Sequence, residues 1–342
     1  NMPSIMTSYH ENGQLRQSLD LVNGRASGTY REWHANGSLH LEAQVIEGMG
    51  SLDPQSLSTF RFHGETHAWD NEGNLIATIP YHMGELHGEA HHDFPDGSPF
   101  RSTEYAHGQR HGWDISYFPD GSREAVRHYH QGEPEGFHQY FGTPAWEETY
   151  KEGRLMSGTY GGKEGEILSQ IAEGGGIKST FDDKGHMTTI TYSGGVVEGE
   201  VAHFKGHKDP INTYSIKDGV KEGEEHIYYE KAPYPLHQQI SWKEGLISGK
   251  CRSWFSDGTL ESERGFCRNK RQGNSYAWYV DGSLMLKERY DNNRLMEGSY
   301  YAIGDPIALS RIKEGEGVAI LHNAEGHFLQ RIAYERGEPL PE

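Results

Sequence analysis

The stretch RHGWDISYFPDGS, residues 110 to 122, contains the plan of the whole chain: a glycine, a short run rich in aromatic residues, and an Asp-Gly step followed by serine. Close copies occur as SGTYREWHANGS, HGEAHHDFPDGS, SGKCRSWFSDGT and QGNSYAWYVDGS. In the clearest part of the chain the unit repeats every 24 residues, as at Gly73, Gly97 and Gly121. Self-similarity at a fixed period of this length indicates a repeat architecture.

Glycines nine residues apart mark the copies, and a further turn residue stands four residues before the first glycine, as Gly108 does before Gly112. Each unit therefore reads turn, strand, turn, strand, which predicts a β-hairpin. A three-residue loop ending in a glycine at positive φ, such as 256–258, would place Trp254 across from Leu260. The glycine pairs are Gly28/Gly37, Gly64/Gly73, Gly88/Gly97, Gly112/Gly121, Gly176/Gly185, Gly249/Gly258, Gly273/Gly282 and Gly317/Gly326.

Aromatic and aliphatic residues fall into three columns in this register. One column includes Trp33, Trp69, Trp254 and Trp278, the second Leu39, Leu75, Leu260 and Leu284, and the third Tyr81, Tyr105, Tyr129 and Tyr290. All three columns share parity along their strands, so we predict that they point to one face and form the core. A lone hairpin is marginally stable in water, so the copies are expected to stack.

These patterns predict an all-β fold: an elongated array of stacked β-hairpins that forms one continuous twisted antiparallel sheet. We expect residues 1–342 to be a single array. Residues 150–176 also align with 290–317, which makes blocks of about 113–200 and 254–342 equivalent.

The chain resembles MORN repeats in YHMGELHGEAHHDFPDGS and YAHGQRHGWDISYFPDGS. It is more similar to the bacterial MORN-variant repeats of the YwqK antitoxin-like family, through YHENGQL at 9–15 and WYVDGSLMLKERYDNN at 278–293. The resemblance covers nearly the whole chain and is weaker at 44–60 and 200–240. It implies an array of β-hairpins that binds proteins or sometimes lipids, and for the antitoxin-like members it implies a role in neutralising a toxin.

The charge balance narrows the classes of partner. The formal net charge is -18, which disfavours nucleic acid and an anionic membrane surface and favours a basic protein partner. Mean hydropathy is -0.81, and the chain has no apolar run long enough to span a membrane. The N-terminal stretch has no apolar signal region, and Asn1 is not an initiator, so we expect residues to be missing before it. Localisation stays open, with the cytoplasm favoured.

A candidate binding surface follows from the residue after each core aromatic, which should point to the opposite face. Its large rings are Phe94, Phe118, Tyr229, Phe255 and Tyr279. A stripe of exposed rings would mark an interaction site. The alternative is that twist packs these rings under a neighbouring hairpin. Both interpretations are compatible with the sequence.

The histidines and cysteines give little indication of a metal site, a disulfide or a catalytic site. His63, His87 and His111 precede first glycines, and their backbones should lie too far apart to share a metal, so we interpret them as a surface ladder. Cys251 should face Glu263, out of step with Cys267, which predicts two reduced thiols. Phosphate-loop, dinucleotide, HExxH and GxSxG patterns are absent.

The sequence therefore predicts no enzyme activity, no cofactor and no metal. It favours a non-catalytic repeat scaffold for protein–protein interaction, and an antitoxin or immunity protein that binds a basic toxin is the more specific form of this hypothesis. The alternative is a glycan- or cell-wall-binding module, because aromatic repeats with Asp-Gly turns also stack on sugars. The sequence leaves the oligomeric state open.

Overall fold

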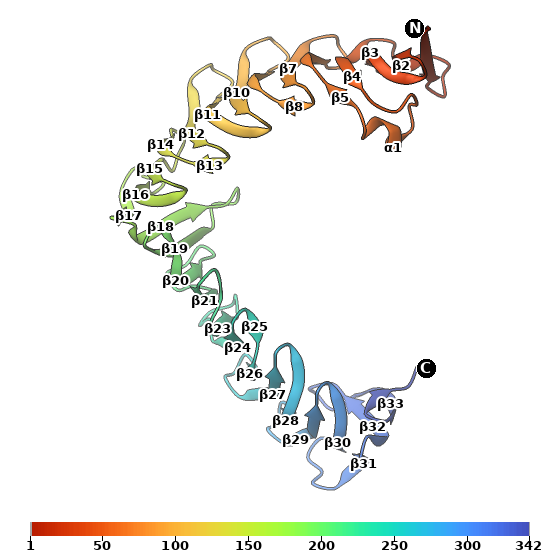
Figure 1. Ribbon diagram of the computed structural model, residues 1–342. Helices are drawn as coiled ribbons and strands as arrows, with labels where there is room; N and C mark the ends of the chain where they lie inside the picture. Colours follow the sequence, from red (N-terminus) through yellow and green to blue (C-terminus); the bar gives the residue numbers. More distant parts are fainter. Residues whose placement is uncertain (1, 342) are drawn as a thin grey trace. The chain divides into compact units, whose positions relative to one another are not determined.

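The computed structural model describes residues 2 to 341, and its regular structure is almost entirely strand. Contacts group the chain into unit 1, Asn1–Gly174, and unit 2, Gly175–Glu342. Within each unit, antiparallel strands follow one another in chain order as stacked hairpins (Figure 1). The prediction of an all-β fold of stacked β-hairpins is confirmed. Asn1, on which the expectation of missing residues depends, lies outside the described residues.

Unit 1 consists of hairpins with one short helix between β4 and β5. Its elements are β1 (Pro3–Tyr9), β2 (Leu15–Val22), β3 (Arg25–Trp33), β4 (Leu39–Glu47), α1 (Pro54–Leu57), β5 (Arg61–Phe62), β6 (Gly64–Trp69), β7 (Leu75–His82), β8 (Glu85–Leu86), β9 (Gly88–Asp93), β10 (Pro99–Ala106), β11 (Gln109–Tyr117), β12 (Arg123–His130), β13 (Glu133–Pro134), β14 (Gly136–Tyr140), β15 (Trp146–Lys151), β16 (Arg154–Gly161) and β17 (Ile167–Ala172).

Unit 2 continues the same plan. Its elements are β18 (Gly175–Phe181), β19 (Met187–Ser193), β20 (Val196–His203), β21 (Asn212–Lys217), β22 (Val220–Lys221), β23 (Gly223–Tyr228), β24 (Leu236–Lys243), β25 (Leu246–Ile247), β26 (Gly249–Trp254), β27 (Leu260–Cys267), β28 (Lys270–Trp278), β29 (Leu284–Asp291), β30 (Arg294–Tyr301), β31 (Ala308–Lys313), β32 (Glu316–His322), β33 (Phe328–Glu335) and β34 (Glu338–Pro339).

The Asp-Gly turns have the predicted geometry. In the turn between β26 and β27, the Phe255 N–H donates to the Thr259 carbonyl at 2.8 Å, and the Gly258 N–H donates to the Phe255 carbonyl at 2.9 Å. Gly258 has φ +87°, a conformation that strains a residue with a side chain. Trp254 lies across from Leu260, as predicted. Local turn chemistry therefore sets the register of each hairpin.

The first glycine of each repeat marks an irregularity that the sequence pattern did not reveal. Between β10 and β11 the register shifts, and Gly112 takes φ +110°. A Cβ on Gly112 would collide with the Glu104 side chain, whose carboxylate accepts the Trp113 N–H. Glycine is therefore needed here for both the positive φ and the close approach of Glu104.

A second irregularity corrects the assignment of faces. The register shifts between Ser253 and Trp254. The aromatic residue four positions before the second glycine, such as Trp254, therefore points away from the face that Ser253 shares with Cys251. The ring of Trp278 accordingly lies beside that of Tyr276, with centroids 6.0 Å apart. The tyrosine column instead lies on the buried face, where Tyr290 packs against the core. The prediction that the tryptophan and tyrosine columns share one face is wrong.

The most buried column lies two residues after the first glycine. We call the face that carries this column the inner face and its reverse the outer face. The inner column is chemically mixed, because tyrosines alternate with small and ionisable residues. Its buried members are Tyr30, Thr66, Ala90, Asp114, His138, Tyr160, Val201, Glu225, Ser275, Tyr300 and Ala319.

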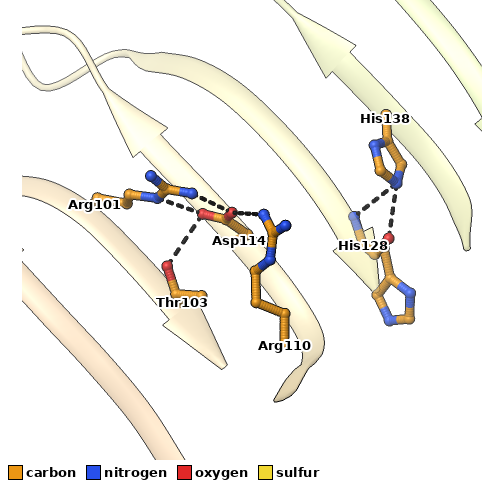
Figure 2. A network of polar contacts seen from close by, with 6 residues as sticks. All are labelled: Arg101, Thr103, Arg110, Asp114, His128 and His138. Atoms are coloured by element: carbon orange, nitrogen blue, oxygen red, sulfur yellow. Dashed lines mark hydrogen bonds and ion pairs between the residues drawn. The ribbon is translucent and has the colours of Figure 1, made fainter. Parts of the chain in front are cut away.

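Neighbouring groups form hydrogen bonds and ion pairs with the ionisable side chains of the inner column. Asp114 accepts two hydrogen bonds from Arg101, at 2.8 and 2.5 Å, and one from the Thr103 hydroxyl at 3.2 Å (Figure 2). The Arg110 guanidinium lies 3.6 Å from the same carboxylate. In the adjacent hairpin, His138 Nε2 lies 2.7 Å from the His128 carbonyl, and burial lowers the pKa of His138. Paired charges thus replace part of the apolar core of a thin sheet.

An apolar cluster forms the core at the start of unit 1. Leu19, Leu21, Ala26, Tyr30 and Val45 are buried together. The segment from Gly48 to Phe60, where the repeat pattern is weak, folds over this cluster and contains α1. Its side chains Leu52, Leu57 and Phe60 pack against the cluster. The irregular segment therefore covers apolar surface in the first hairpins.

The two cysteines are free, and their predicted register needs one correction. Cys251 pairs with Arg264 rather than with Glu263, because the shift at Trp254 adds one residue to β27. Burial raises the pKa of the Cys251 thiol. Among the helices of residues 2–341, none is long and apolar enough to cross a bilayer.

Candidate interaction surface

The five rings predicted to form a binding surface lie at the beginning of the Asp-Gly turns or of their longer equivalent. Phe94, Phe118 and Phe255 are partly buried, and each donates its N–H across the turn at 2.8 Å. Phe94 also contacts Phe100 edge-on, with ring centroids 5.2 Å apart. Because the residue before each ring, Asp93, Tyr117 or Trp254, points outward, these rings are turned toward the inner side of the hairpin. Binding at them stays a prediction.

Tyr229 and Tyr279 connect neighbouring parts of the array. The Tyr229 hydroxyl donates to the Trp254 carbonyl at 2.7 Å, and the Tyr279 hydroxyl donates to the Tyr301 carbonyl at 2.6 Å. Tyr279 is only 1% exposed, so the expectation of an exposed ring at this position is wrong. At both residues the structure matches the alternative in which twist packs the ring against a neighbouring hairpin.

The outer face of unit 1 carries a different aromatic pair, Trp113 and Phe137. Both residues directly follow a first glycine, and their side chains are 44% and 43% exposed. Trp113 contacts the His128 ring edge-on at 4.7 Å. The pair could have been found from the sequence, because both residues occupy the same position of consecutive repeats, but it became apparent only once the inner column was known.

Polar groups surround this pair. Phe137 lies opposite Thr149, which lies opposite Ser157 across β14, β15 and β16. Phe137 lines a shallow hollow of about 180 Å³, whose other outer-face side chains include Glu147 and Gln170. The aromatic pair with a polar rim has the composition of a protein interaction site.

Charge is distributed unevenly between the two units. Unit 1 contains 25 Asp and Glu against 11 Lys and Arg, whereas unit 2 contains 25 against 21. Part of this negative charge is held on the turn edge, where hydrogen bonds from Ser98 and Ser122 lower the pKa of Asp96 and Asp120. The exposed Trp113 and Phe137 therefore lie in the more acidic unit.

The histidines of the predicted ladder accept hydrogen bonds from backbone amides of later turns. His63 Nδ1 accepts the Met83 N–H at 3.1 Å, and His111 Nδ1 accepts the Gln131 N–H at 3.2 Å. Other repeats place a Glu or Gln acceptor at the same position, as Gln272 does for the Asn292 N–H at 2.8 Å. The residue before the first glycine thus binds the turn that follows, about 20 residues later.

Substitution of His111 with alanine is expected to increase the hydrogen exchange rate of the Gln131 amide roughly fivefold, because one hydrogen bond to an exposed turn is lost. H111Q keeps an acceptor at this position, as in the Gln272 repeat, and should preserve protection. Amide exchange measured by NMR or mass spectrometry checks both variants. Equal exchange in H111A and the wild type would show that the contact does not hold the turn.

Two further features bear on ligand binding. Among residues 2–341, no group of three His, Cys, Asp or Glu side chains is placed to hold a metal ion. On the inner face of unit 2, small side chains at Cys251, Ser253 and Ala277 leave a hollow of about 530 Å³ that Phe266 also lines. The hollow shows that the inner column is not filled by large rings throughout.

Comparisons with known proteins support the repeat assignment. Residues 4–23 match the family model described as MORN repeat variant, so the chain carries a MORN-variant repeat. No curated protein matches the chain.

Two crystal structures show only distant similarity to the chain. The first, "Crystal Structure of TcdB2-TccC3-Cdc42", has 10% identity and a TM-score of 0.17. The second, "Crystal Structure of TcdB2-TccC3 without hypervariable C-terminal region", has 11% identity and a TM-score of 0.13. Both alignments cover 96% of this chain, which spans only 19% of each of those chains.

Proposed function

We propose that the protein is a non-catalytic repeat scaffold that binds a basic protein partner on the outer face of unit 1. The observation that carries this proposal is the exposed pair Trp113 and Phe137 in a unit with a large excess of acidic residues. The MORN-variant repeat and the all-β repeat architecture are compatible with a scaffold of this kind.

The physical argument combines burial with long-range attraction. Large exposed rings contribute most of the affinity at many protein interfaces, because they bury much apolar area at a low entropic cost. The negative charge of unit 1 would attract a basic partner and speed its association, and salt would weaken this attraction. The sheet supplies a preformed surface, so little binding energy would be lost to ordering.

A capture experiment with paired variants tests the proposal. The full chain is immobilised and exposed to lysate of the source organism, and bound proteins are identified by mass spectrometry. We expect W113A/F137A to capture roughly tenfold less of the basic protein than the wild type, because both anchoring rings are removed. Binding by the wild type should also decrease as salt increases.

The matched control is K250A/N274A, because Lys250 and Asn274 follow the first glycines at the equivalent positions of unit 2. This variant should retain the captured protein. The proposal fails if both double variants capture the same proteins at the same level, or if the captured proteins are acidic.

An antitoxin or immunity role is the finer form of this proposal. In that case the captured protein would be a toxin, and the wild-type chain would suppress its activity while W113A/F137A would not. A hit on a glycan array, without any salt-sensitive protein, would favour the glycan-binding alternative.

A further inference from the structure

Four cations lie close together on the outer face of unit 2, within a chain of net charge -18. They line a hollow of about 480 Å³ together with Glu297 and Ser299. All four side chains are exposed. We call this surface the basic groove; its cations are Lys287, Arg289, Arg311 and Lys313.

The strand register arranges the basic groove in two rows across β29, β30 and β31. In one row Arg289 lies opposite Glu297, and their charged groups are 3.3 Å apart. In the other row Lys287 lies opposite Ser299, and Ser299 lies opposite Arg311. In the second row the Ser299 hydroxyl therefore lies between two cations. At the matching position of the first row stands the carboxylate of Glu297.

The cations of the second row lack an internal counter-charge. Within residues 2–341, neither Lys287 nor Arg311 forms an ion pair, and the same holds for Lys313. Their backbones are two strand spacings apart, or about 10 Å, so both long side chains can reach a group held above Ser299. Like charges at this spacing repel each other, and a bound anion would relieve that repulsion.

The equivalent surface of unit 1 lacks this charge pattern. There the second row consists of Glu147, Thr159 and Gln170, in the same register across β15, β16 and β17. These side chains line the smaller hollow of about 180 Å³. The strand register is the same in both copies, so they differ here in side-chain charge and not in backbone pairing.

We propose that the basic groove binds an acidic peptide segment of a partner protein, with one carboxylate above Ser299 between Lys287 and Arg311. The Ser299 hydroxyl and both cations donate hydrogen bonds to this carboxylate. The bound group takes the role in the second row that Glu297 has in the first. This site is separate from the proposed site for a basic partner on unit 1.

Charge complementarity favours a short acidic segment over larger polyanions. Nucleic acid or an anionic membrane would bring negative charge near many acidic groups of this chain, and the repulsion would oppose binding. A short peptide meets only the groove. A carboxylate also carries less charge than a phosphate, so the neighbouring Glu297 repels it less.

Fluorescence anisotropy at low ionic strength tests the proposal with a labelled eight-residue peptide of alternating Glu and Ser. We expect K287Q/R311Q to weaken binding at least roughly tenfold, because two charge-assisted hydrogen bonds are lost. E297Q should tighten binding, because it removes the repelling carboxylate. A peptide with Gln in place of Glu should not bind.

Unit 1 provides a gain-of-function arm. The variant E147K/Q170R builds the same row of charges around Thr159, and it should raise the peptide stoichiometry from one to two. Unchanged affinity in K287Q/R311Q, or a stoichiometry that stays at one in E147K/Q170R, would overturn the proposal. So would tighter binding of inorganic phosphate, a single-stranded oligonucleotide or phosphatidylserine vesicles that K287Q/R311Q abolishes.

Discussion

Tyr300→Ala is expected to lower the free energy of unfolding of unit 2 by about 4 kcal/mol, because it removes a large, fully enclosed ring. Tyr300 is 1% exposed and packs with Leu295 and Ile312. Its hydroxyl donates to Glu288 at 2.8 Å, and burial followed by the charge of Glu288 raises its pKa. The substitution therefore leaves a cavity and also takes a donor from a buried carboxylate.

Hydrogen exchange by mass spectrometry locates this effect. Y300A should increase exchange in β29 to β32, whereas the strands β2 to β4 should keep wild-type protection. Y300F separates the two contributions, since it keeps the ring and should cost about 1 to 2 kcal/mol for the lost hydrogen bond. Y301A, at a partly exposed neighbour, is the control. A similar loss of stability in Y300A and Y301A would contradict the assignment of Tyr300 to the core.

Asp114→Ala is expected to destabilise unit 1 by about 2 to 3 kcal/mol. The Asp114 side chain is 1% exposed, so its removal leaves Arg101 and Arg110 without their shared counter-charge (Figure 2). Breaking a fully buried pair costs about 3 to 5 kcal/mol, but the two arginine side chains are 42% and 40% exposed, and water screens them. Urea unfolding at pH 7 measures the difference.

Asp114 also makes the stability of the fold depend on pH, and the direction of its pKa shift fixes the sign of this dependence. Desolvation raises the pKa of Asp114, but the hydrogen bonds and charge of Arg101 outweigh it, so the net pKa lies below the ordinary value. The stabilisation is therefore fully present above the unfolded-state pKa of about 3.9 and is lost as the pH falls through the lower folded-state value. The stability difference between the wild type and D114N should be smaller at pH 3 than at pH 7.

A turn residue of the same hairpin is the control for Asp114. Asp120 is exposed, and within residues 2–341 its carboxylate accepts hydrogen bonds only from Ser122, so D120A should have a much smaller effect than D114A. If D114A and D120A destabilise the chain equally, the buried ion pair is not the cause.

Much of the fold could be predicted from the chain because turn chemistry is local. A glycine at positive φ fixes a hairpin without help from distant residues, so the pairing of Trp254 with Leu260 followed from the Asp-Gly pattern. The two-residue turns, such as Asn23-Gly24 with φ values of 54° and 75°, could be placed for the same reason. The repeat period then defined the order of the strands.

The candidate surface could not be predicted as well, because it depends on which way each side chain points. Side chains alternate with a period of two, so the one-residue shift at Trp254 changes which side chains of β27 share a face with those of β26. The equivalent shift at Trp278 places Tyr279 in the interior. Trp113 and Phe137 are among the exposed rings of unit 1.

The sequence by itself therefore determined the repeated hairpin, its turns and the overall acidity, because these depend on neighbouring residues and on composition. Only the tertiary structure decided that Asp114 is an inner residue, that Tyr229 and Tyr279 bridge hairpins, and that Lys287 and Arg311 flank Ser299. These features depend on contacts across strands, where a one-residue change of register reverses the face and separates the partners.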